Sequence, residues 1–494
     1  MENYSIEKLK KTLLDGAGTY LSTQEVKKIS KAISIALDAH KGQKRNSGDD
    51  FIVHPLSVAI ILLELKVDAD TLIAAVLHDT IEDTEYKINE IKKVFNADVA
   101  KLVESVTKLS NVRIKKTWFP FWKVKKEEIP EFERQMETLR KMLVAMSKDI
   151  RVIIIKLADK IHNLRTLKYL DKEKRERIAS ETIEIFAPIA GRLGIGKWKG
   201  NLEDLAFVHL YPHEYEKLRE MAIPKIKDRE KILAKLSKEV EQMLADGSIE
   251  AQVDYRAKRW YSLYKKLEKY DGDLDKIHDL IAIRVIVKNL EDCYGALGII
   301  HGKWKPLIGR IKDYIALPKP NGYQSLHTTV FTNAGEIVEI QIRTESMHEQ
   351  AEFGIASHWI YSQDRRSKKP NRKEVDWLKE FSKFQKSITN PAEFFKVLKM
   401  DLFENRIFVF TPDGDVKDLP SGATAIDFAY SVHTQVGNHC FGAKVNNKIT
   451  SFDKPLSNGD IVEIITAKKT TPNKDWLNFC KTQAARNNIR KFTR

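Results

Sequence analysis

The stretch Gly309–Arg343, GRIKDYIALPKPNGYQSLHTTVFTNAGEIVEIQIR, decides how the rest of the chain is interpreted. It opens with cations around a loop rich in Pro, Asn and Gly, and it ends in residues 337–343, which alternate apolar and polar side chains. Cations on a loop hold polyphosphate, and strict alternation is typical of a half-buried strand. Period-2 spacing places Glu339, Gln341 and Arg343 on one side of that strand, where the loop can deliver a nucleotide.

Three segments of this stretch carry a family resemblance. They are RIKDYI at 310–315, PNGYQSLHTTV at 320–330 and VEIQIRT at 338–344. In this order they resemble the synthetase domain of the Rel/SpoT family, whose bifunctional members make and degrade the alarmone (p)ppGpp. A long ordered match is more specific than one short motif. The resemblance implies a mixed-sheet α/β domain like that of the nucleotidyltransferases.

Length, charge and cysteine usage bound the remaining possibilities. A chain of 494 residues exceeds what one core usually serves, and 42% hydrophobic with 31% charged residues is typical of folded globular proteins. Lys and Arg number 84 against 69 Asp and Glu, and this surplus of +15 suits polyanions such as nucleotides, RNA or an acidic membrane face. Three scattered cysteines suit a reducing compartment, and we find no apolar run typical of a signal peptide or long enough for a bilayer. We therefore expect a cytoplasmic protein without membrane contact.

The first third predicts an all-helical domain, because apolar residues in 22–208 recur mostly at helical spacing. Polar residues suited to chemistry form three pieces, Arg45 with IVHP at 52–55, LHDTIED at 77–83 and LADKIHNLRT at 157–166. Helical spacing places His78 and Glu82 one turn apart on one helix side, as it does Asp79 and Asp83.

The order His…His-Asp…Asp resembles the HD-superfamily phosphohydrolases, and the Rel/SpoT hydrolase in particular. The resemblance implies four metal ligands, His54, His78, Asp79 and Asp159. Such a mixed N/O set suits a divalent ion such as Mn²⁺, which activates a bound water and polarises a phosphoryl oxygen. The resemblance also implies that Glu82 and Asp83 position or deprotonate water, and that Arg45, Asn163 and Thr166 bind the substrate. The implied reaction is loss of the 3′-pyrophosphate from (p)ppGpp.

Some features of the first third stand outside this assignment. A histidine or aspartate standing alone is more often structural, and we assign that role to His162. The segment Lys115–Arg134 is longer than the family resemblance leads us to expect, and we expect its aromatic cluster, Trp118–Trp122, to cover another surface of the same protein. Gly191 stands where the family usually has a histidine, so helix packing between the first two domains is expected to differ.

The middle of the chain predicts a nucleotide pyrophosphotransferase. Residues 255–267 interleave cations and aromatics, and on one helix Lys258, Ser262 and one lysine a turn later would share a side. Alone, such a segment would be a solvated basic helix. Asp279 precedes a β-branched run, 281–287, which predicts a buried strand. Together these segments resemble the ATP site of the family.

The resemblance assigns roles to individual residues of this domain. Pyrophosphoryl transfer needs charge neutralisation and in-line positioning, so the carboxylates of Asp279 and Glu339 would hold Mg²⁺, and Glu339 would also polarise the 3′-hydroxyl of GDP or GTP. The implied ATP-binding residues are Arg256, Lys258, Ser262, Lys266 and Arg284. The implied guanine-nucleotide-binding residues are Lys312, Lys319, Asn321, Tyr323 and His327, with the Tyr323 ring stacked on the base.

Further residues refine this assignment. Gln341 and Arg343 share the side of Glu339 and are second-rank candidates, whereas we expect His301 and His348 to be structural. The basic sequence R-x-K-D at 310–313 is typical of family members with both activities.

The last third resembles a TGS domain, a small β-grasp module. A strand from Arg406, a Pro-Asp-Gly turn, a helix near Thr424 and further strands are expected. The resemblance implies contact with the ribosome or tRNA, and His433 matches a position that meets the tRNA acceptor end in related proteins. The expected division is a hydrolase domain at 1–200, a synthetase domain at 201–375, a linker helix at 376–403, a TGS domain at 404–467 and a basic helical tail at 468–494. Longer relatives continue beyond this tail, and the sequence leaves open whether the chain is a fragment or a naturally short enzyme.

Two alternatives remain open at this stage. An RNA- or ribosome-binding regulator with vestigial enzyme sites would fit the +15 charge and the TGS module. An HD phosphohydrolase acting on another nucleotide would fit the first domain. Neither explains why residues suited to both chemistries are present together.

Overall fold

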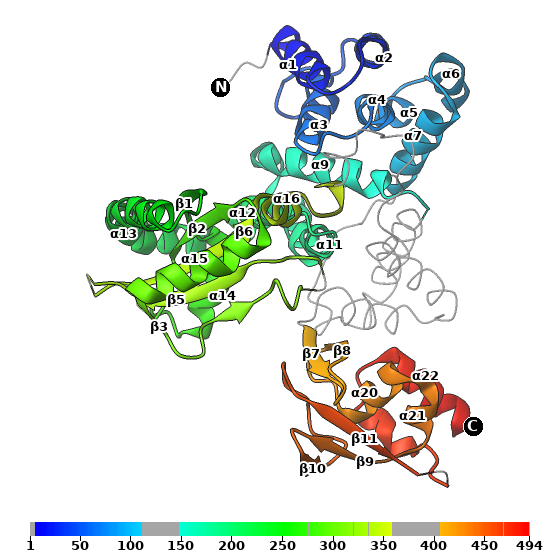
Figure 1. Cartoon of the computed structure of the whole chain (residues 1–494). Helices are drawn as coiled ribbons and strands as arrows, with labels where there is room; N and C mark the ends of the chain where they lie inside the picture. Colours follow the sequence, from blue (N-terminus) through cyan, green and yellow to red (C-terminus); the bar gives the residue numbers. More distant parts are fainter. Residues whose placement is uncertain are drawn as a thin grey trace. The chain divides into compact units, whose positions relative to one another are not determined.

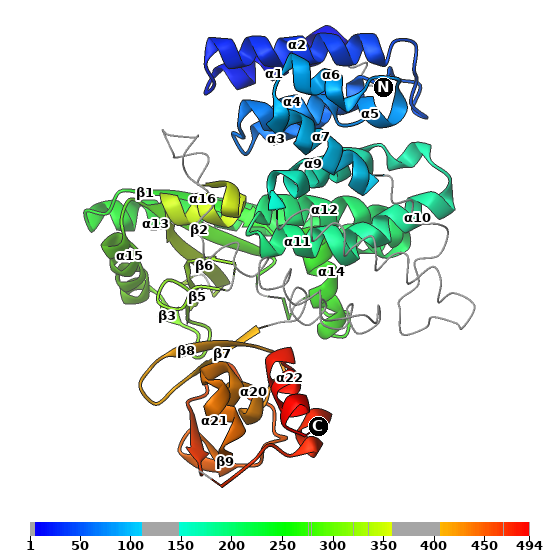
Figure 2. The ribbon, with the colours of Figure 1, turned by 90° about the vertical axis from the view of Figure 1, so that its right-hand side faces the viewer.

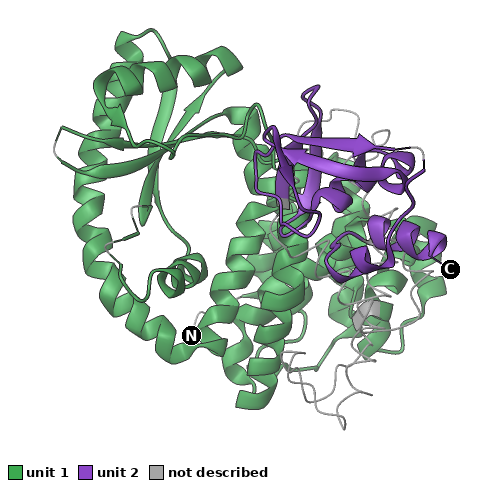
Figure 3. Ribbon diagram, turned by 90° about the horizontal axis from the view of Figure 1, so that it is seen from below, with its two compact units in different colours: residues 1–387 green, residues 388–494 purple. Residues whose placement is uncertain are grey.

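A computed structural model of the chain describes residues 5–110, 148–357 and 406–493, apart from residues 275, 278, 320, 334 and 468. The chain divides into two compact units, residues 1–387 and 388–494 (Figure 3). The predicted aromatic cluster at Trp118–Trp122 and the predicted linker helix at 376–403 lie outside the described residues. Within the described ranges, no helix has the length and apolar character needed to span a membrane.

The described residues of the first part of unit 1 form helices and no extended strand, as predicted (Figure 1, blue to cyan). Its α-helices are α1 Ile6–Gly18, α2 Thr23–Ala39, α3 Val53–Leu63, α4 Ala69–Leu77, α5 Thr80–Asp83, α6 Ile88–Val94, α7 Ala97–Ser110, α9 Arg151–Arg165, α10 Lys172–Glu181, α11 Ala187–Arg192 and α12 Gly196–Leu210. Side-chain caps fix several starts: Ser22 forms a capping box with Glu25, and Asp68 accepts from the Thr71 backbone N–H. The helices α3, α4 and α9 are buried on almost every side and form the centre of this domain.

The prediction of one helix through residues 77–83 is wrong. The helix α4 ends at Leu77, and α5 starts anew at Thr80. The Thr107 hydroxyl of α7 donates to the His78 carbonyl at 3.0 Å, and the Asp79 carbonyl accepts from the Glu82 and Asp83 backbones. Because the His78 carbonyl is bound by another helix, the α-helical ladder is interrupted there, and His78 and Asp79 lie at a junction between two helices.

The second part of unit 1 contains a six-stranded mixed sheet of order β1-β2-β6-β5-β3, with β4 paired to β5. The strands are β1 Ala251–Ala257, β2 Ile281–Val287, β3 Lys305–Pro306, β4 Lys312–Asp313, β5 Leu326–Phe331 and β6 Ile337–Thr344, and the helices are α13 Pro212–Asp246, α14 Trp260–Lys269, α15 Leu290–Lys303 and α16 Glu345–Phe353. Only the β2–β6 pair is parallel among the described strands of this sheet. Figures 1 and 2 show α13 and α15 against the sheet.

The alternation predicted for residues 337–343 is confirmed through Ile342. Val338, Ile340 and Ile342 are buried in a core shared with α13 and α15, and Glu339 and Gln341 lie on the opposite, more open face. Arg343 is an exception, because it is itself buried. The polar face of β6 is therefore free to carry chemistry.

The prediction that Lys258 shares a helix with Ser262 is wrong. Residues 251–257 form β1, which pairs antiparallel with β2 from Ala251 to Ala257, and α14 begins at Trp260. Lys258 lies in the link between strand and helix, where its backbone N–H bonds the Leu280 carbonyl. Pairing with the apolar strand β2 overrides the local helical pattern of cations and aromatics.

The helix α12 belongs to both parts of unit 1. It packs against α9, α10 and α11 on one side and against α14 and α16 on the other. The domain boundary predicted near residue 200 falls inside this helix. Gly191, on α11, contributes its carbonyl to the Asn321 side chain at 3.2 Å, so the two parts are joined by polar contacts as well.

Unit 2 contains the strands and helix predicted from the sequence. Its elements are β7 Arg406–Phe410, β8 Val416–Pro420, α20 Ala425–Val432, α21 Thr434–Asn438, β9 Cys440–Val445, β10 Lys448–Thr450, β11 Val462–Thr466 and α22 Gln483–Phe492. The helix α20 begins with a capping box between Thr424 and Asp427. The buried Asp427 carboxylate also accepts from the Lys481 and Thr482 backbones, which holds the basic tail on the module. His433 accepts a backbone hydrogen bond at the start of α21.

Candidate metal centre and nucleotide site

Two histidines and two aspartates from three helical segments meet in the helical domain. His54 comes from α3, His78 and Asp79 from the α4–α5 junction, and Asp159 from α9. Nε2 of His54 lies 3.2 Å from Asp159 Oδ1 and 3.5 Å from Asp79 Oδ2, and Nε2 of His78 lies 3.1 Å from Asp79 Oδ1. Ligand atoms of His54, His78 and Asp159 all lie within 4.8 Å of one another, as a metal-binding cluster requires.

Hydrogen bonds on the far side of each imidazole leave the inner nitrogens with lone pairs that could bind a metal ion. Nδ1 of His78 is 2.7 Å from the Ala75 carbonyl, which accepts, so Nδ1 carries the proton and Nε2 carries the lone pair. That buried Nε2 forms no hydrogen bond with any described residue. Since its lone pair faces a carboxylate oxygen, a cation between the two groups would relieve the repulsion.

The same reasoning gives the tautomer of His54, because His54 forms a hydrogen bond with His162. The sequence analysis assigned His162 only a structural role. Arg45 Nη1 lies 3.4 Å from Nδ1 of His162, and a guanidinium donates, so this nitrogen accepts. Nδ1 of His54, 2.8 Å away, must then donate to it, which leaves the His54 Nε2 lone pair facing the carboxylates. Burial, followed by the nearby His54 and Arg45, lowers the pKa of His162 to about 2, so it stays neutral. Three of the four predicted ligands, His54, His78 and Asp159, therefore fit a divalent metal ion, and Asp79 carboxylate oxygens lie within 3.5 Å of both histidine Nε2 atoms.

Lys156 is a second residue of this cluster that the sequence analysis missed. Its ammonium lies 2.7 Å from Asp159 Oδ2, while Asp159 Oδ1 faces His54. Burial acts to raise the pKa of Asp159, but the Lys156 ammonium holds it well below its usual range. The sequence did contain a signal for this role, because Lys156 interrupts the apolar run 152–157 one turn before Asp159.

Of the other predicted hydrolase residues, Arg45 and Asn163 contact this cluster. Asn163 donates to Asp159 Oδ1 and accepts from Arg45 Nη2 at 3.0 Å, which links substrate-binding candidates to the cluster. Thr166 ends α9, and its hydroxyl bonds backbone carbonyls of that helix. Glu82 and Asp83 line an open cavity of about 880 Å³. Burial, then Asp83 and Asp79, raise the pKa of Glu82, which suits a group that handles protons.

The two carboxylates predicted for the synthetase share one cavity of about 270 Å³. Asp279 lies just before β2 and accepts from both Lys258 and Lys266. Burial acts to raise its pKa, but the two lysines lower it. Asp279 is therefore ionised beside two cations, as a phosphate-binding site requires.

Glu339 faces the same cavity from β6. Its Oε1 lies 3.3 Å from His327 Nδ1 and accepts from Gln341 Nε2 at 2.9 Å. Burial acts to raise the pKa of Glu339, but these two neighbours lower it. The register pairs Glu339 with Ala282 of β2, close to where Asp279 precedes that strand.

Lys319 is enclosed by aromatic rings. Its ammonium lies 4.5 Å from the Tyr314 ring centroid and 4.8 Å from that of Tyr323, and the Tyr323 hydroxyl lies 2.8 Å from His327 Nε2. Burial, then Lys312 and Lys199, lower the pKa of Lys319. The Tyr323 ring thus contacts a cation of the cavity wall without lining the cavity itself, and the base stacking stays a prediction.

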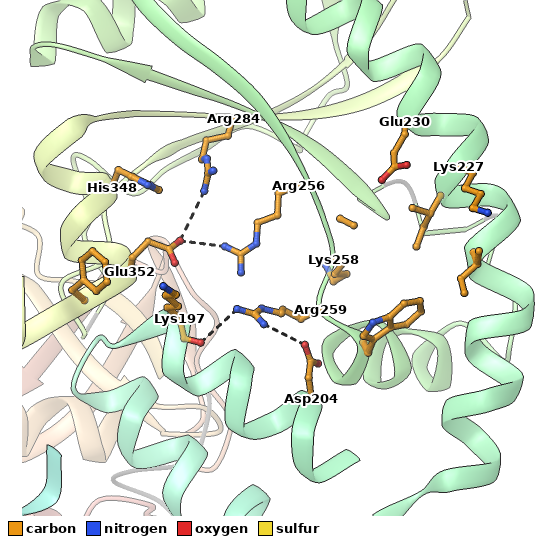
Figure 4. A pocket seen from close by; sticks show the side chains of 15 residues that line it. Lys197, Asp204, Lys227, Glu230, Arg256, Lys258, Arg259, Arg284, His348 and Glu352 are labelled. Atoms are coloured by element: carbon orange, nitrogen blue, oxygen red, sulfur yellow. Dashed lines mark hydrogen bonds and ion pairs between the residues drawn. The ribbon is translucent and has the colours of Figure 1, made fainter. Parts of the chain in front are cut away.

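Other predicted nucleotide residues divide between two cavities. Arg256 and Arg284 line a second cavity of about 760 Å³, and Lys258 lines both (Figure 4). Arg310, Tyr314 and Lys276 line the smaller cavity but were not assigned roles from the sequence. Ser262 lines neither cavity, and Asn321 bonds α11 instead. His348, expected to be structural, lines the larger cavity.

Comparison with known families agrees with this architecture. Residues 32–196 match the HD domain, residues 255–366 match the region found in RelA / SpoT proteins, and residues 407–466 match the TGS domain. The protein is thus of the class that joins an HD domain to a RelA / SpoT region and a TGS domain.

Relatives match over nearly the whole chain. GTP pyrophosphokinase of Streptomyces coelicolor is 44% identical over 97% of this chain and 57% of its own length. Guanosine-3′,5′-bis(diphosphate) 3′-pyrophosphohydrolase of Aquifex aeolicus is 45% identical over 95% of this chain and 65% of its own length. Bifunctional (p)ppGpp synthase/hydrolase SpoT of Escherichia coli K12 is 43% identical over 96% of this chain and 66% of its own length. The chain belongs to the Rel/SpoT family, and it spans 57 to 66% of the length of these relatives.

Proposed function

We propose that this chain is a bifunctional alarmone enzyme of the stringent response. It would transfer the pyrophosphoryl group of ATP to the 3′-hydroxyl of GDP or GTP, and it would hydrolyse (p)ppGpp to GDP or GTP and pyrophosphate. The observation that carries the proposal is the presence of two separate charged centres, one formed by His54, His78 and Asp159 and the other lined by Asp279 and Glu339. The names of the relatives, which cover both activities, support it.

The helical domain, expected at residues 1–200, would be the hydrolase. His54, His78, Asp79 and Asp159 would hold Mn²⁺, which when bound activates water and polarises the phosphoryl oxygen. Glu82, whose pKa is raised, would take a proton from the attacking water with Asp83 beside it. Arg45 and Asn163, already joined by a hydrogen bond, would hold the nucleotide with Thr166.

The mixed-sheet domain, expected at residues 201–375, would be the synthetase. Asp279 and Glu339 would hold Mg²⁺, which when bound neutralises charge on the ATP phosphates. The ionised Glu339 carboxylate would accept the proton of the 3′-hydroxyl while the hydroxyl oxygen bonds to the β-phosphorus of ATP. The bond between the β-phosphorus and the oxygen of the α-phosphate would break, which releases AMP. Lys312, Lys319 and His327 line the cavity from the guanine-nucleotide side, and Lys258 and Lys266 from the ATP side.

The larger cavity would hold the nucleoside part of ATP. It adjoins the smaller cavity through Lys258 and is lined by Arg256 and Arg284. A chain of phosphates bound at Lys258 and Lys266 would place the nucleoside beside these arginines. We also propose a cytoplasmic location, and contact of the TGS module at 404–467 with the ribosome or tRNA, for which the matching family and the basic charge are the support.

The test is direct assay of both reactions with purified protein. Incubation with ATP, GDP and Mg²⁺ should yield ppGpp and AMP, and incubation with ppGpp and Mn²⁺ should yield GDP and pyrophosphate. Chelation should abolish hydrolysis, and added Mn²⁺ should restore it. RNA binding without either reaction would favour a regulator with vestigial sites, and breakdown of a different nucleotide alone would favour another phosphohydrolase.

A further inference from the structure

One carboxylate on α16 faces three arginines at the wall of the larger cavity. Glu352 Oε1 lies 3.2 Å from Nη1 of Arg256, 3.9 Å from Nη1 of Arg284 and 3.9 Å from Nη2 of Arg343. Figure 4 shows Arg256 and Arg284 both directed toward Glu352. We propose that Glu352 is a positioning residue of the ATP site, which holds Arg256 beside Arg284. This inference rests on the proposed synthetase activity.

The charges around Glu352 explain why the position of Arg256 depends on this one carboxylate. Arg284 has a second carboxylate partner, since its Nε donates to Asp254 at 2.9 Å and its Nη2 also donates to Asp254. Arg343 is held by its surroundings, with only 4% of its side chain exposed. Arg256 is 42% exposed, so it is the arginine most free to leave. Without the Glu352 charge, repulsion from the two fixed arginines would favour its movement into solvent.

The backbone that carries Glu352 is fixed at both ends of α16. The Thr344 hydroxyl accepts from the Met347 backbone at the first turn. Gly354, just after the helix, has φ +54°, and a Cβ there would lie 2.1 Å from the Leu193 carbonyl. The Ile355 backbone donates to that same carbonyl at 3.0 Å. Because the α16 backbone is fixed, Glu352 can hold Arg256 in place and would not move with the arginine.

Glu352 does not compete with a nucleotide for Arg256. The hydrogen bond uses Nη1 of Arg256, whereas the guanidinium as a whole still lines the cavity (Figure 4). A guanidinium has five N–H groups and two flat faces, so it can bind a carboxylate at one end and a ligand elsewhere. Removal of the carboxylate should therefore weaken ATP binding, not strengthen it.

The test is steady-state synthesis by Glu352→Gln, which keeps size and removes charge. The KM for ATP should rise about tenfold, as for loss of one charge-assisted hydrogen bond. The kcat at saturating ATP and the KM for GDP should stay within about twofold, because the carboxylate pair at the reacting groups is untouched. The matched control is Glu345→Gln, at the exposed start of the same helix, which should leave all three constants unchanged.

A double-mutant cycle separates positioning from a general structural effect. In an Arg256→Ala background, Glu352→Gln should add less than about twofold to the ATP KM, because the residue it positions is absent. Glu352→Asp, which keeps the charge on a shorter side chain, should lie between wild type and Glu352→Gln. Retained ppGpp hydrolysis and an unchanged circular dichroism spectrum show that each variant is folded.

The outcomes distinguish this inference from the proposed function. If the wild-type protein makes no ppGpp from ATP and GDP, the proposed function itself fails. If wild type is active and Glu352→Gln has an unchanged or lowered ATP KM, only the positioning role is overturned. Full additivity with Arg256→Ala, or equal losses for ATP and GDP, would also overturn it. If Glu352→Gln does not fold, Glu352→Asp is measured instead, and an ATP KM equal to that of wild type would overturn the positioning role.

Discussion

Lys156 neutralises a buried aspartate of the candidate metal-binding cluster. Its side chain is 11% exposed and that of Asp159 is 5% exposed, so neither charge has much access to water. Burial acts to lower the pKa of Lys156, but Asp159 raises it, so the lysine stays charged. The cation binds one oxygen of Asp159 and leaves the other directed at His54.

Lys156→Met should destabilise the metal-free protein strongly. Removal of one partner from a buried ion pair typically costs about 3–5 kcal/mol. Urea unfolding in chelator should show a loss of this order, and a divalent ion should recover part of it by binding Asp159. Lys172→Met, which removes an 81%-exposed lysine, is the control and should have almost no effect. Equal stability of Lys156→Met and Lys172→Met would contradict the role of Lys156.

Tyr323→Ala should impair guanine-nucleotide use more than ATP use. The ring contacts the Lys319 ammonium and is predicted to stack on the base, and loss of a stacking ring costs about 1–3 kcal/mol. The apparent KM for GDP should rise about tenfold or more, as measured by initial rates of synthesis. Tyr323→Phe keeps the ring and loses the bond to His327, so its GDP KM should change much less. A larger effect of Tyr323→Ala on ATP would mean that the two nucleotide sites are assigned in reverse.

At the scale of elements, α16 places a histidine among the arginines of the larger cavity. Burial, then Arg343 and Arg284, lower the pKa of His348 from 6.5 to about 4. Between these values the unfolded chain binds a proton that the folded protein does not, so stability is lost as the pH falls from about 6.5 toward 4.

His348→Gln should therefore reduce the pH dependence of stability. The difference in unfolding free energy between pH 7 and pH 5 should shrink by about 1 kcal/mol, a value discounted because the ring is only half-buried. Urea unfolding of wild type and variant at both pH values measures it. His213→Gln, at an exposed position of α13, is the control. An identical pH dependence in wild type and His348→Gln would contradict the assignment.

Elements with one dominant pattern could be predicted from the sequence, and elements with competing patterns could not. Residues 337–342 alternate strictly, and β6 follows that alternation. Residues 255–267 carry cations and aromatics that suit a helix, but residues 255–257 pair with β2 and belong to the strand β1. The break at His78 depends on a hydrogen bond from Thr107, a residue 29 positions away, which no local pattern contains.

At the scale of the whole molecule, the family resemblance identified the residue types of both centres, but not the groups that orient them. His162 and Lys156 act through contacts between side chains of different helices or turns, and Glu352 acts on β1, β2 and β6 at once. Such convergence depends on tertiary packing. The helix α12, which packs against helices of both parts, shows that the two centres share one compact unit.

The central claim is that this one unit carries two chemically independent sites. Glu339→Gln keeps size but removes a carboxylate from the synthetase cavity, so synthesis should fall by orders of magnitude while hydrolysis persists. His78→Ala removes a proposed metal ligand, so hydrolysis should fall while synthesis persists. The measurement is both rates for both variants, with folding checked by circular dichroism. Each folded variant should lose one activity and keep the other near the wild-type rate, and loss of both activities in either folded variant would contradict the account.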